Sequence, residues 1–558
     1  MWDNLPLLSL ILLSPLLGVL VLTVIPKENG RLLQRVGIAA SFLPLLFSCI
    51  LFVQFQAQIA DFQFVEQHSW IRIPLDKSLL GATSFTLSFD YHLAVDGLSL
   101  PLVFLTALVA AMAALASVQI KKRWKLFYIL FLLLETAMFG VFMARDLFLF
   151  FLFFEAALVP VFFLVGIWGS VNREKAAIQF LLYNGIGSAL MLTAFLILIA
   201  TAGFTLDEQT MAFQYSGDIQ TIMNNLFHNP EAYLNYANNP FTLTAGMKTF
   251  LFFLLLLAFG IKLPVFPFHT WMLKMHQEAP PSVVMIHSGI LLKMGAYGLI
   301  RFGILLFPEQ AKSYTLLLAV LGLINLLYGA ILAFVQKDFR LVLAYSSVSQ
   351  MGIVLLGLAA FNTAGWSGAV FQLVSHGLIS ALLFLLVGSL CERTGTTELA
   401  KLSGLASSIP FISGILLFAG LASLGLPGLS GFVGELLVFV GLSGSYKAIA
   451  AVGLLGLVLA AAYMLRAVLA MTFGPPGDEA PRTVGGSGVI APNGGGAASA
   501  SGGPRYRDAR LIEAVPMIIL TTFILLLGVY PGMISHTVEK AVADFTSHIE
   551  STVAKAGE

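Results

Sequence analysis

Cysteine and charge are both scarce in this sequence. Cys49 and Cys391 are the only two cysteines among 558 residues, and they lie far apart, which excludes an iron–sulfur cluster or a disulfide framework built from this chain alone. We expect both to be unreactive core residues. Charged residues make up 11% of the chain and hydrophobic residues 58%, whereas soluble domains carry about 25% charged residues. The sequence therefore predicts a polytopic membrane protein.

Signals for nucleic acid and nucleotide binding are also lacking. The 30 basic and 29 acidic residues nearly balance, so there is no excess of basic residues to form a nucleic-acid-binding face. Residues 474–510 are rich in Gly, Ala, Ser and Pro, but no G-x-G-x-x-G passes through them and no strand precedes them. We interpret this stretch as a flexible cytoplasmic linker. The N-terminal apolar run follows Asp3 without a Lys or Arg, unlike a secretory signal, and predicts a retained spanning helix.

Long apolar runs dominate the rest of the chain. Each is about 20 residues or more, the length that crosses a bilayer as a helix. The predicted spans lie near 5–25, 36–56, 97–117, 124–143, 147–168, 177–202, 247–270, 283–306, 313–335, 341–360, 367–391, 409–441, 448–473 and 511–534. The fold class is therefore an all-α membrane protein with about fourteen transmembrane helices.

The loops between these runs give an orientation. Most loop Lys and Arg residues fall in one set of alternate loops, and cytoplasmic loops are enriched in these residues, which predicts that both termini lie on the outer side. Residues 57–96 and 203–246 are then polar outer loops, and the alternation in SWIRIPL and TSFTLSFDY predicts a hairpin. The tail after residue 535 mixes charged and apolar residues, which suggests an amphipathic outer helix.

Two apolar runs are interrupted by proline and glycine. GIKLPVFPF contains Pro264 and GLPGLSGF contains Pro427, and proline breaks a helix by removing a backbone donor. The two breaks, in helices 7 and 12, are five segments apart, a pattern typical of repeated transporter halves; simple kinks are the alternative. We divide the chain into helices 1–3 with the outer hairpin, two inverted five-helix repeats, the linker, and helix 14 with the tail: 1–123, 124–306, 313–473, 474–510 and 511–558.

Ionisable residues lie deep inside several predicted spans. Lys262 and Lys293 sit in apolar runs, and so do Glu155, Glu435 and Glu135. Charges at this depth are costly and usually mark ion or proton pathways. Glu155 is the expected partner of Lys262, because its helix carries no other ionisable group at that depth. Moving a carboxylate by a few ångströms would change the pairing energy strongly at low dielectric. The alternatives are snorkelling lysines and glutamates packed as neutral, hydrogen-bonded acids.

Three histidines extend this set. His287 and His376 lie within spans, and His269 follows the first break. Histidine has two ring nitrogens and changes charge near neutral pH, so these residues suit a proton relay. Satisfied core histidines and paired haem ligands are the alternative interpretations.

These features together resemble a known family, the antiporter-like membrane subunits of respiratory complex I, in particular the subunit M type of NADH-quinone oxidoreductase. The resemblance covers about residues 90–470. It is carried, in order, by VDGLSLPLVFL, DLFLFFLFFEAALVPVFFLVGIWG, AFGIKLPVFPFHTWMLKMHQEAPPSV, GILLKMGAYGLIRF, DFRLVLAYSSVSQMGIVLLG, QLVSHGLISALLFLLVGSLCERTGT and GLPGLSGFVGE.

The resemblance implies proton pumping by Glu155, Lys262, Lys293 and Glu435, with His376 on a central hydrophilic axis. It implies no cofactor on this chain: NADH, FMN, iron–sulfur clusters and quinone would bind partner subunits of the peripheral arm. It also implies contacts with subunits of the L and N types in a bacterial plasma membrane. A multisubunit sodium/proton antiporter or a hydrogenase-type complex is the alternative function, and a non-transporting scaffold gives no reason to bury five charges.

This chain departs from the family pattern in two places. Lys274 stands where many members have an acid, in WMLKMH rather than WLPDAH, and Gln350 stands where SVSHMG has a histidine. A glutamine cannot pass a proton without water. His287 is more typical of the related antiporter subunits than of subunit M.

Overall fold

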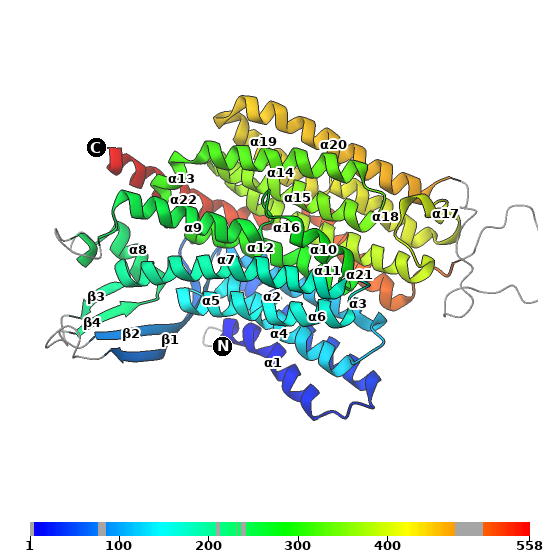
Figure 1. The fold of residues 1–558 in the computed structure, drawn as a ribbon, viewed down its shortest axis with the longest axis horizontal. Coiled ribbons are helices and arrows are strands. Elements are labelled where there is room, and N and C mark those ends of the chain that lie inside the picture. Colours follow the sequence, from blue (N-terminus) through cyan, green and yellow to red (C-terminus); the bar gives the residue numbers. More distant parts are fainter. Residues whose placement is uncertain are drawn as a thin grey trace, which may run out of the picture.

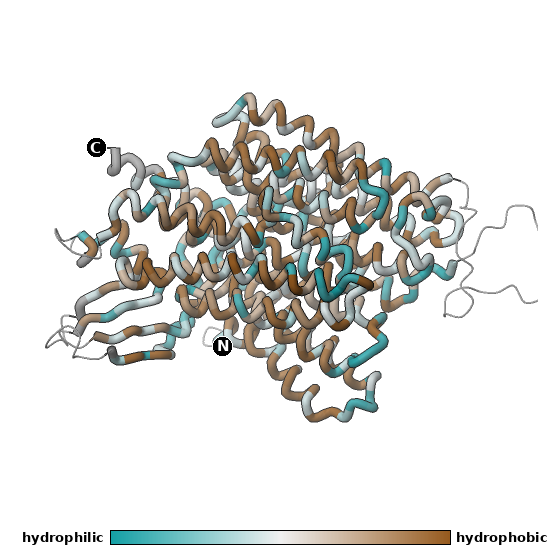
Figure 2. Tube along the Cα trace, viewed as in Figure 1, coloured by the Kyte–Doolittle hydropathy of each residue, from teal (hydrophilic) through white to brown (hydrophobic). Residues whose placement is uncertain are grey.

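The computed structural model is an elongated helical bundle with a small sheet at one end (Figure 1). It describes residues 5–75, 85–207, 212–229, 232–235, 242–474 and 506–557. Most of the predicted linker, residues 475–505, lies outside the described residues. The tube of Figure 2 is largely apolar along the helices, with hydrophilic segments concentrated in the connections between them.

The α-helices are α1 (Leu7–Val24), α2 (Gly30–Gln54), α3 (Ser99–Ala116), α4 (Trp124–Met143), α5 (Leu147–Ala156), α6 (Leu158–Trp168), α7 (Arg173–Thr201), α8 (Ile219–Phe227), α9 (Ala245–Lys262), α10 (Thr270–Glu278), α11 (Pro281–Ile286), α12 (Leu292–Gly298), α13 (Pro308–Ser313), α14 (Thr315–Val335), α15 (Phe339–Ala359), α16 (Thr363–Thr394), α17 (Leu405–Ser408), α18 (Pro410–Ser423), α19 (Ser430–Ser445), α20 (Lys447–Thr472), α21 (Leu511–Val529) and α22 (Gly532–Gly557). The π-helical segments are η4 (His287–Leu291) and η5 (Leu299–Ile304), and short 3₁₀ turns are η2 (Ser117–Gln119), η3 (Tyr233–Asn235) and η6 (Leu399–Lys401).

The predicted all-α membrane fold is confirmed. Thirteen helices in the described part of the chain are long and apolar enough to cross a membrane. Three of them are composite: one formed by α3 with the 3₁₀ turn η2, one by α5 with α6, and one running from α11 to η5. The remaining predicted span, 409–441, consists of the shorter apolar helices α18 and α19.

The strands are β1 (Gln63–Leu75), β2 (Phe85–Val95), β3 (Phe204–Asp207) and β4 (Ala212–Ser216), paired in the order β1-β2-β4-β3. The antiparallel pair β1–β2 confirms the predicted hairpin. The second polar loop adds β4 parallel to β2, with Phe85 opposite Phe213. We call this part of the molecule, with α8, the sheet end; α20 ends and α21 begins at the opposite, linker end (Figure 1).

The long helix α16 is the centre of the bundle. Its membrane-length window is buried entirely inside the molecule, as is that of the composite span from α11 to η5. α16 packs against α3, α11, α15, α18, α19, α21 and α22. Because these two spans have no lipid-facing side, their polar side chains point into protein. The C-terminal helix α22 confirms the predicted tail helix and lies at the sheet end (Figure 1).

The helical path is interrupted near both prolines identified in the sequence. α9 ends at Lys262 and α10 starts only at Thr270, and α18 and α19 are separated by residues 424–429. At the first interruption, Asn325 of α14 accepts a hydrogen bond from the backbone N–H of Phe266 (2.7 Å) and donates one to the carbonyl of Pro264 (3.3 Å). One side chain therefore satisfies two backbone groups that the lost helix leaves open inside the bundle.

Candidate functional site

Lys262 is the last residue of α9 and is only 2% exposed. Its ammonium has no hydrogen-bond partner in the protein and lies 4.1 Å from the centre of the Phe154 ring. A cation over an aromatic face is stabilised by the ring's quadrupole. The break after α9 thus leaves a buried ammonium at a helix end, facing an aromatic ring rather than a carboxylate.

Glu155 follows Phe154 near the end of α5, where the composite span changes from α5 to α6. Its charge acts on Lys262, but no ion pair within 4.0 Å joins the two among the described side chains. The Oε1 atom of Glu155 is buried and has no protein partner. The expected pairing of Glu155 with Lys262 is therefore electrostatic and not a direct contact.

A buried histidine pair lies within electrostatic range of both lysines. His276 of α10 and His287 of η4 share a hydrogen bond of 2.8 Å between Nε2 and Nδ1, and both rings are buried. The charges of Lys262 and Lys293 both act on His287. His276 is absent from our sequence-based candidates, although it belongs to the WMLKMH segment.

Lys293 lies on α12, directly after the π-helical segment η4, and is fully buried. Its Nζ atom is 2.8 Å from Nδ1 of His376 on α16 and also donates to the backbone carbonyl of Ser288. The predicted candidates Lys293 and His376 are therefore in direct contact, on two spans that have no lipid-facing side.

Glutamine side chains connect α16 with the second broken region. Gln372 lies one helical turn from His376 on α16, so both face the same side. Gln372 donates to Oε1 of Gln350, and Gln350 donates to Oε1 of Glu435 at 3.1 Å. Glu435 is 5% exposed and belongs to α19. A row of hydrogen-bonded amides thus ends on this carboxylate.

The loop before α19 closes around the same carboxylate. Gly425 has φ +77°, a conformation that glycine adopts at little cost. A Cβ atom at this position would lie 2.3 Å from Oε2 of Glu435. The glycine therefore permits both the turn after α18 and the close approach of the loop to Glu435.

These groups form one row through the bundle, which we call the polar row. From the α5 side to the α19 side its members are Glu155, Lys262, His287 with His276, Lys293, His376, Gln372, Gln350 and Glu435. Hydrogen bonds join three stretches of the row: His287 with His276, Lys293 with His376, and Gln372 with Gln350 and Glu435. Neighbouring stretches lie within electrostatic range of each other or one helical turn apart. His276 and Gln372 were not among the residues predicted from the sequence; for Gln372, its position four residues before His376 was the available signal.

Two other candidates lie outside the polar row. The carboxyl oxygens of Glu135 on α4 and the hydroxyl of Ser41 on α2 are buried without a hydrogen bond. His269 lies in the break before α10, packed against Phe266 and Tyr328, and neither ring nitrogen has a partner. No hydrogen bond joins either residue to the polar row.

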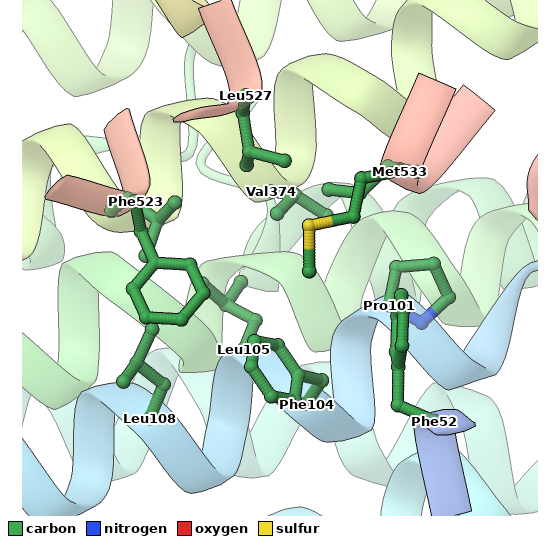
Figure 3. A pocket seen from close by; sticks show the side chains of 11 residues that line it. Phe52, Pro101, Phe104, Leu105, Leu108, Val374, Phe523, Leu527 and Met533 are labelled. Carbon is green, nitrogen blue, oxygen red and sulfur yellow. The ribbon is translucent and has the colours of Figure 1, made fainter. Parts of the chain in front are cut away.

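A separate apolar pocket lies between α2, α3, α16, α21 and α22 and is shown in Figure 3. It is lined by Phe52, Pro101, Phe104, Leu105, Leu108, Val374, Leu378, Phe523, Leu527, Met533 and Ile534. None of these side chains can bind or release a proton, so the pocket does not belong to the polar row. In the described residues, no cluster of three or more His, Cys, Asp or Glu side chains could hold a metal ion.

Comparison with known proteins places this arrangement in a family. Residues 144–460 match the transmembrane family described as NADH:quinone oxidoreductase/Mrp antiporter. The NAD(P)H-quinone oxidoreductase chain 4 2 of Thermosynechococcus vestitus is 40% identical over 83% of this chain and 81% of its own length. The NADH-quinone oxidoreductase subunit M of Rhodobacter capsulatus is 35% identical over 96% of each chain.

A solved structure agrees with these sequence relatives. A chain of respiratory complex I from Thermus thermophilus with bound NADH superposes with a TM-score of 0.76 at 29% identity, covering 97% of this chain and 99% of that one. The match thus extends over the N-terminal helices and the tail as well as the central region. The chain belongs to the NADH:quinone oxidoreductase/Mrp antiporter transmembrane family, as a relative of the complex I subunit M and chain 4 proteins.

Proposed function

We propose that this chain is a proton-translocating membrane subunit of NADH-quinone oxidoreductase and that the polar row is its transfer path. The observation that carries the proposal is the direct contact of buried Lys293 with His376, extended on either side by the histidine pair and the amide chain. Buried ionisable groups at membrane depth are costly, and a proton path explains their retention.

Electron transfer would belong to partner subunits. NADH, FMN, iron–sulfur clusters and quinone would bind there, and subunits of the L and N types would be the neighbours of this chain in the membrane arm. The positive-inside bias supports an orientation with both termini outside a bacterial plasma membrane. The two five-helix repeats would cover predicted spans 4–8 (residues 124–306) and 9–13 (residues 313–473). The first would contain the interruption after α9 and the second the interruption after α18.

The mechanism begins at Glu155 and Lys262. With Glu155 nearby, the carboxylate compensates the buried ammonium; when Glu155 moves away, the charge is left in a low-dielectric interior, and transfer of the proton becomes favourable. Oε1 of Glu155 and Nζ of Lys262 are both buried without a protein partner, and a water molecule bridging them would supply the missing hydrogen bonds. The movement of one carboxylate thus sets the direction of transfer.

The proton then passes along the row. His287 and His276 accept and donate through their ring nitrogens and hand the proton to Lys293 and His376. Because amides do not carry a proton at neutral pH, Gln372 and Gln350 orient water rather than relay directly, and Glu435 receives the proton. Redox-driven changes in the partner subunits would move Glu155 and so drive the cycle.

A lysine substitution tests this function. Lys262→Ala in the intact complex, reconstituted in liposomes, should lower NADH-driven proton pumping on the order of 10²-fold, since it removes an acid–base group. Lys274→Ala is the matched control, because Lys274 is exposed on neighbouring α10. Normal assembly with wild-type pumping in Lys262→Ala would contradict the proposal. Because the family includes Mrp antiporters, pumping that requires sodium would instead favour the antiporter alternative.

A further inference from the structure

A second cluster of buried charges lies at the sheet end, away from the polar row. Arg301 of η5 forms an ion pair with Asp96, which precedes α3, and the two side chains are 5% and 1% exposed. Arg145, between α4 and α5, is also buried, and the charges of Asp96, Arg301 and Asp218 all act on it. Four segments distant in sequence, which carry Asp96, Arg145, Asp218 and Arg301, thus bring two arginines and two aspartates together.

Several polar atoms in this cluster have no protein partner. Oδ2 of Asp96, Nη2 of Arg145 and Nε of Arg301 are all buried without a hydrogen bond. A purely structural ion pair is expected to satisfy its remaining donors and acceptors, because each buried group left without a hydrogen bond destabilises the fold. Two open donors and one open acceptor in the same buried space fit bound water molecules.

A histidine–carboxylate pair is held next to the cluster by backbone hydrogen bonds of Arg145. Nδ1 of His92 on β2 lies 2.7 Å from Oδ1 of Asp218, the N-cap of α8. The backbone of Arg145 links the two elements, since its N–H donates to the carbonyl of His92 and its carbonyl accepts from Ile219. The sheet and α8 therefore hold His92 and Asp218 against the arginine cluster.

A stripe of side chains connects this cluster with the polar row. Lys293, Tyr297 and Arg301 are spaced four residues apart on one continuous span, and residues at this spacing share a helix face. Tyr297 is 2% exposed, its hydroxyl donates to the carbonyl of Phe142 (3.2 Å), and its ring centre is 5.3 Å from the Arg301 guanidinium carbon. The tyrosine hydroxyl is thus the polar group between Lys293 and Arg301 on this face.

On its other side the cluster borders a surface pocket. Phe62 lies 3.4 Å from the guanidinium of Arg145, and Phe545 of α22 lies 5.4 Å from that of Arg301. Both rings also line a pocket with Asp61, Thr221 and Asp544. Thr221 donates to Oδ2 of Asp218 through its backbone and hydroxyl. The pocket thus reaches the arginines past two aromatic rings and reaches Asp218 through Thr221.

We infer that this cluster is a second proton-transfer site, which connects Lys293 with the sheet-end surface through Tyr297, the buried water positions and the His92–Asp218 pair. This inference rests on the proposed proton translocation. The Tyr297 hydroxyl passes its proton to water, and the Tyr297 oxygen takes one in its place from the Lys293 ammonium. His92 takes up the proton from that water at a ring nitrogen and releases it to water in the pocket. No electron moves, and each donor regains one proton per cycle.

A tyrosine substitution is the first test. Tyr297→Phe in the reconstituted complex should lower NADH-driven pumping about tenfold, the lower range for removal of a proton-transfer group. Tyr128→Phe is the matched control, because Tyr128 is also a buried tyrosine in a span and its hydroxyl has no partner. Wild-type pumping in Tyr297→Phe, or an equal loss in Tyr128→Phe, would overturn the inference.

A second variant remains informative if Tyr297→Phe does not assemble. Phe545→Cys, modified from the sheet-end side by a membrane-impermeant cationic thiol reagent, should inhibit pumping because the added charge occupies the pocket. The parent complex, which keeps Cys49 and Cys391, is the reagent control. It is needed because Cys49 is exposed and Cys391 half-buried, so neither is the core residue expected from the sequence. Complete modification without inhibition would overturn the inference. The Lys262→Ala result separates the two proposals. If Lys262→Ala loses pumping while Tyr297→Phe and the modified Phe545→Cys pump like the wild type, the proposed function stands and this inference fails.

Discussion

Gln350 donates a hydrogen bond from Nε2 to Oε1 of Glu435 at 3.1 Å, and its own Oε1 accepts one from Gln372. The carboxylate at the end of the polar row is therefore held by a neutral amide rather than by a cation. An amide fixes the position of a carboxylate while leaving its charge uncompensated. Any proton that reaches Glu435 along this route has to cross two side chains that do not titrate.

Substitution of Gln350 should separate positioning from proton transfer. Gln350→Leu leaves Glu435 and Gln372 without their buried hydrogen-bond partner, so we expect pumping to fall about tenfold. Gln350→His restores the residue type of the related SVSHMG motif and supplies a titrating ring, so it should retain pumping. NADH-driven acidification in liposomes measures both. Equal activity of the leucine variant and the wild type would exclude a role for this amide.

Substitution of Asn325 should weaken the region around the first helix interruption. Asn325→Leu removes the acceptor for the N–H of Phe266 and the donor to the carbonyl of Pro264. Two unsatisfied backbone groups inside the bundle should cost about 1–3 kcal/mol each. We expect a lower thermal midpoint of the purified complex and a lower yield.

The control for this experiment lies one helical turn away on the same helix. Asn325→Asp keeps the acceptor and should lose less stability than Asn325→Leu, whereas Leu321→Ala changes α14 without touching the interruption. An unchanged midpoint in Asn325→Leu would show that the interruption is held by other contacts.

Asp146, the N-cap of α5, should make the stability of the sheet end depend on pH. Burial raises the pKa of Asp146 from 3.8 to about 6, against hydrogen bonds from the backbone N–H groups of Leu149, Asp90 and Phe148 that lower it. Between these two values the folded state binds more protons than the unfolded state, so stability falls as pH rises from about 4 to about 6 and then stays level.

Asp146→Asn tests this dependence. The amide keeps an acceptor for Phe148 and Leu149 and removes a buried charge whose cost at pH 7 is roughly 3 kcal/mol, about two pKa units. The thermal midpoint of the variant should exceed that of the wild type at pH 7 and approach it near pH 4. Asp61→Asn, at an exposed position, should match the wild type throughout. A constant difference between Asp146→Asn and wild type across this range would contradict the expectation.

Local features of the fold could be predicted from the sequence, because each is encoded within a short stretch. Apolar runs of membrane length gave the spans, alternation gave the β1–β2 hairpin, and Pro264 and Pro427 marked the places where helices end. The burial of Lys262 and Lys293 also followed from their apolar neighbours. Boundaries differed by several residues where the ends of a span carry polar residues, as at the start of α2.

Contacts between distant segments could not be predicted from these patterns. The parallel pairing of β4 with β2, the role of Asn325 and the pairing of Arg301 with Asp96 each join residues that share no local signal. His276 was missed because it lies outside the predicted spans, on the short helix α10 that folds back toward His287. Glu155 was expected to contact Lys262, yet Phe154 takes that position.

The π-helical segment η4 has a consequence for how this protein tolerates change in length. In η4 the N–H of Leu292 bonds to the carbonyl of His287, five residues back, so the segment holds one residue more than an α-helical turn would. A deletion within η4 can be absorbed by a return to α-helical winding, which leaves the following residues facing nearly the same way. Deleting a residue from α11, where no such segment absorbs the change, would rotate everything that follows by about 100°. Lys293 would then swing away from His376 although every side chain of the row was still present. The chain's proton chemistry therefore depends on the winding of this span as much as on the residues that carry charge.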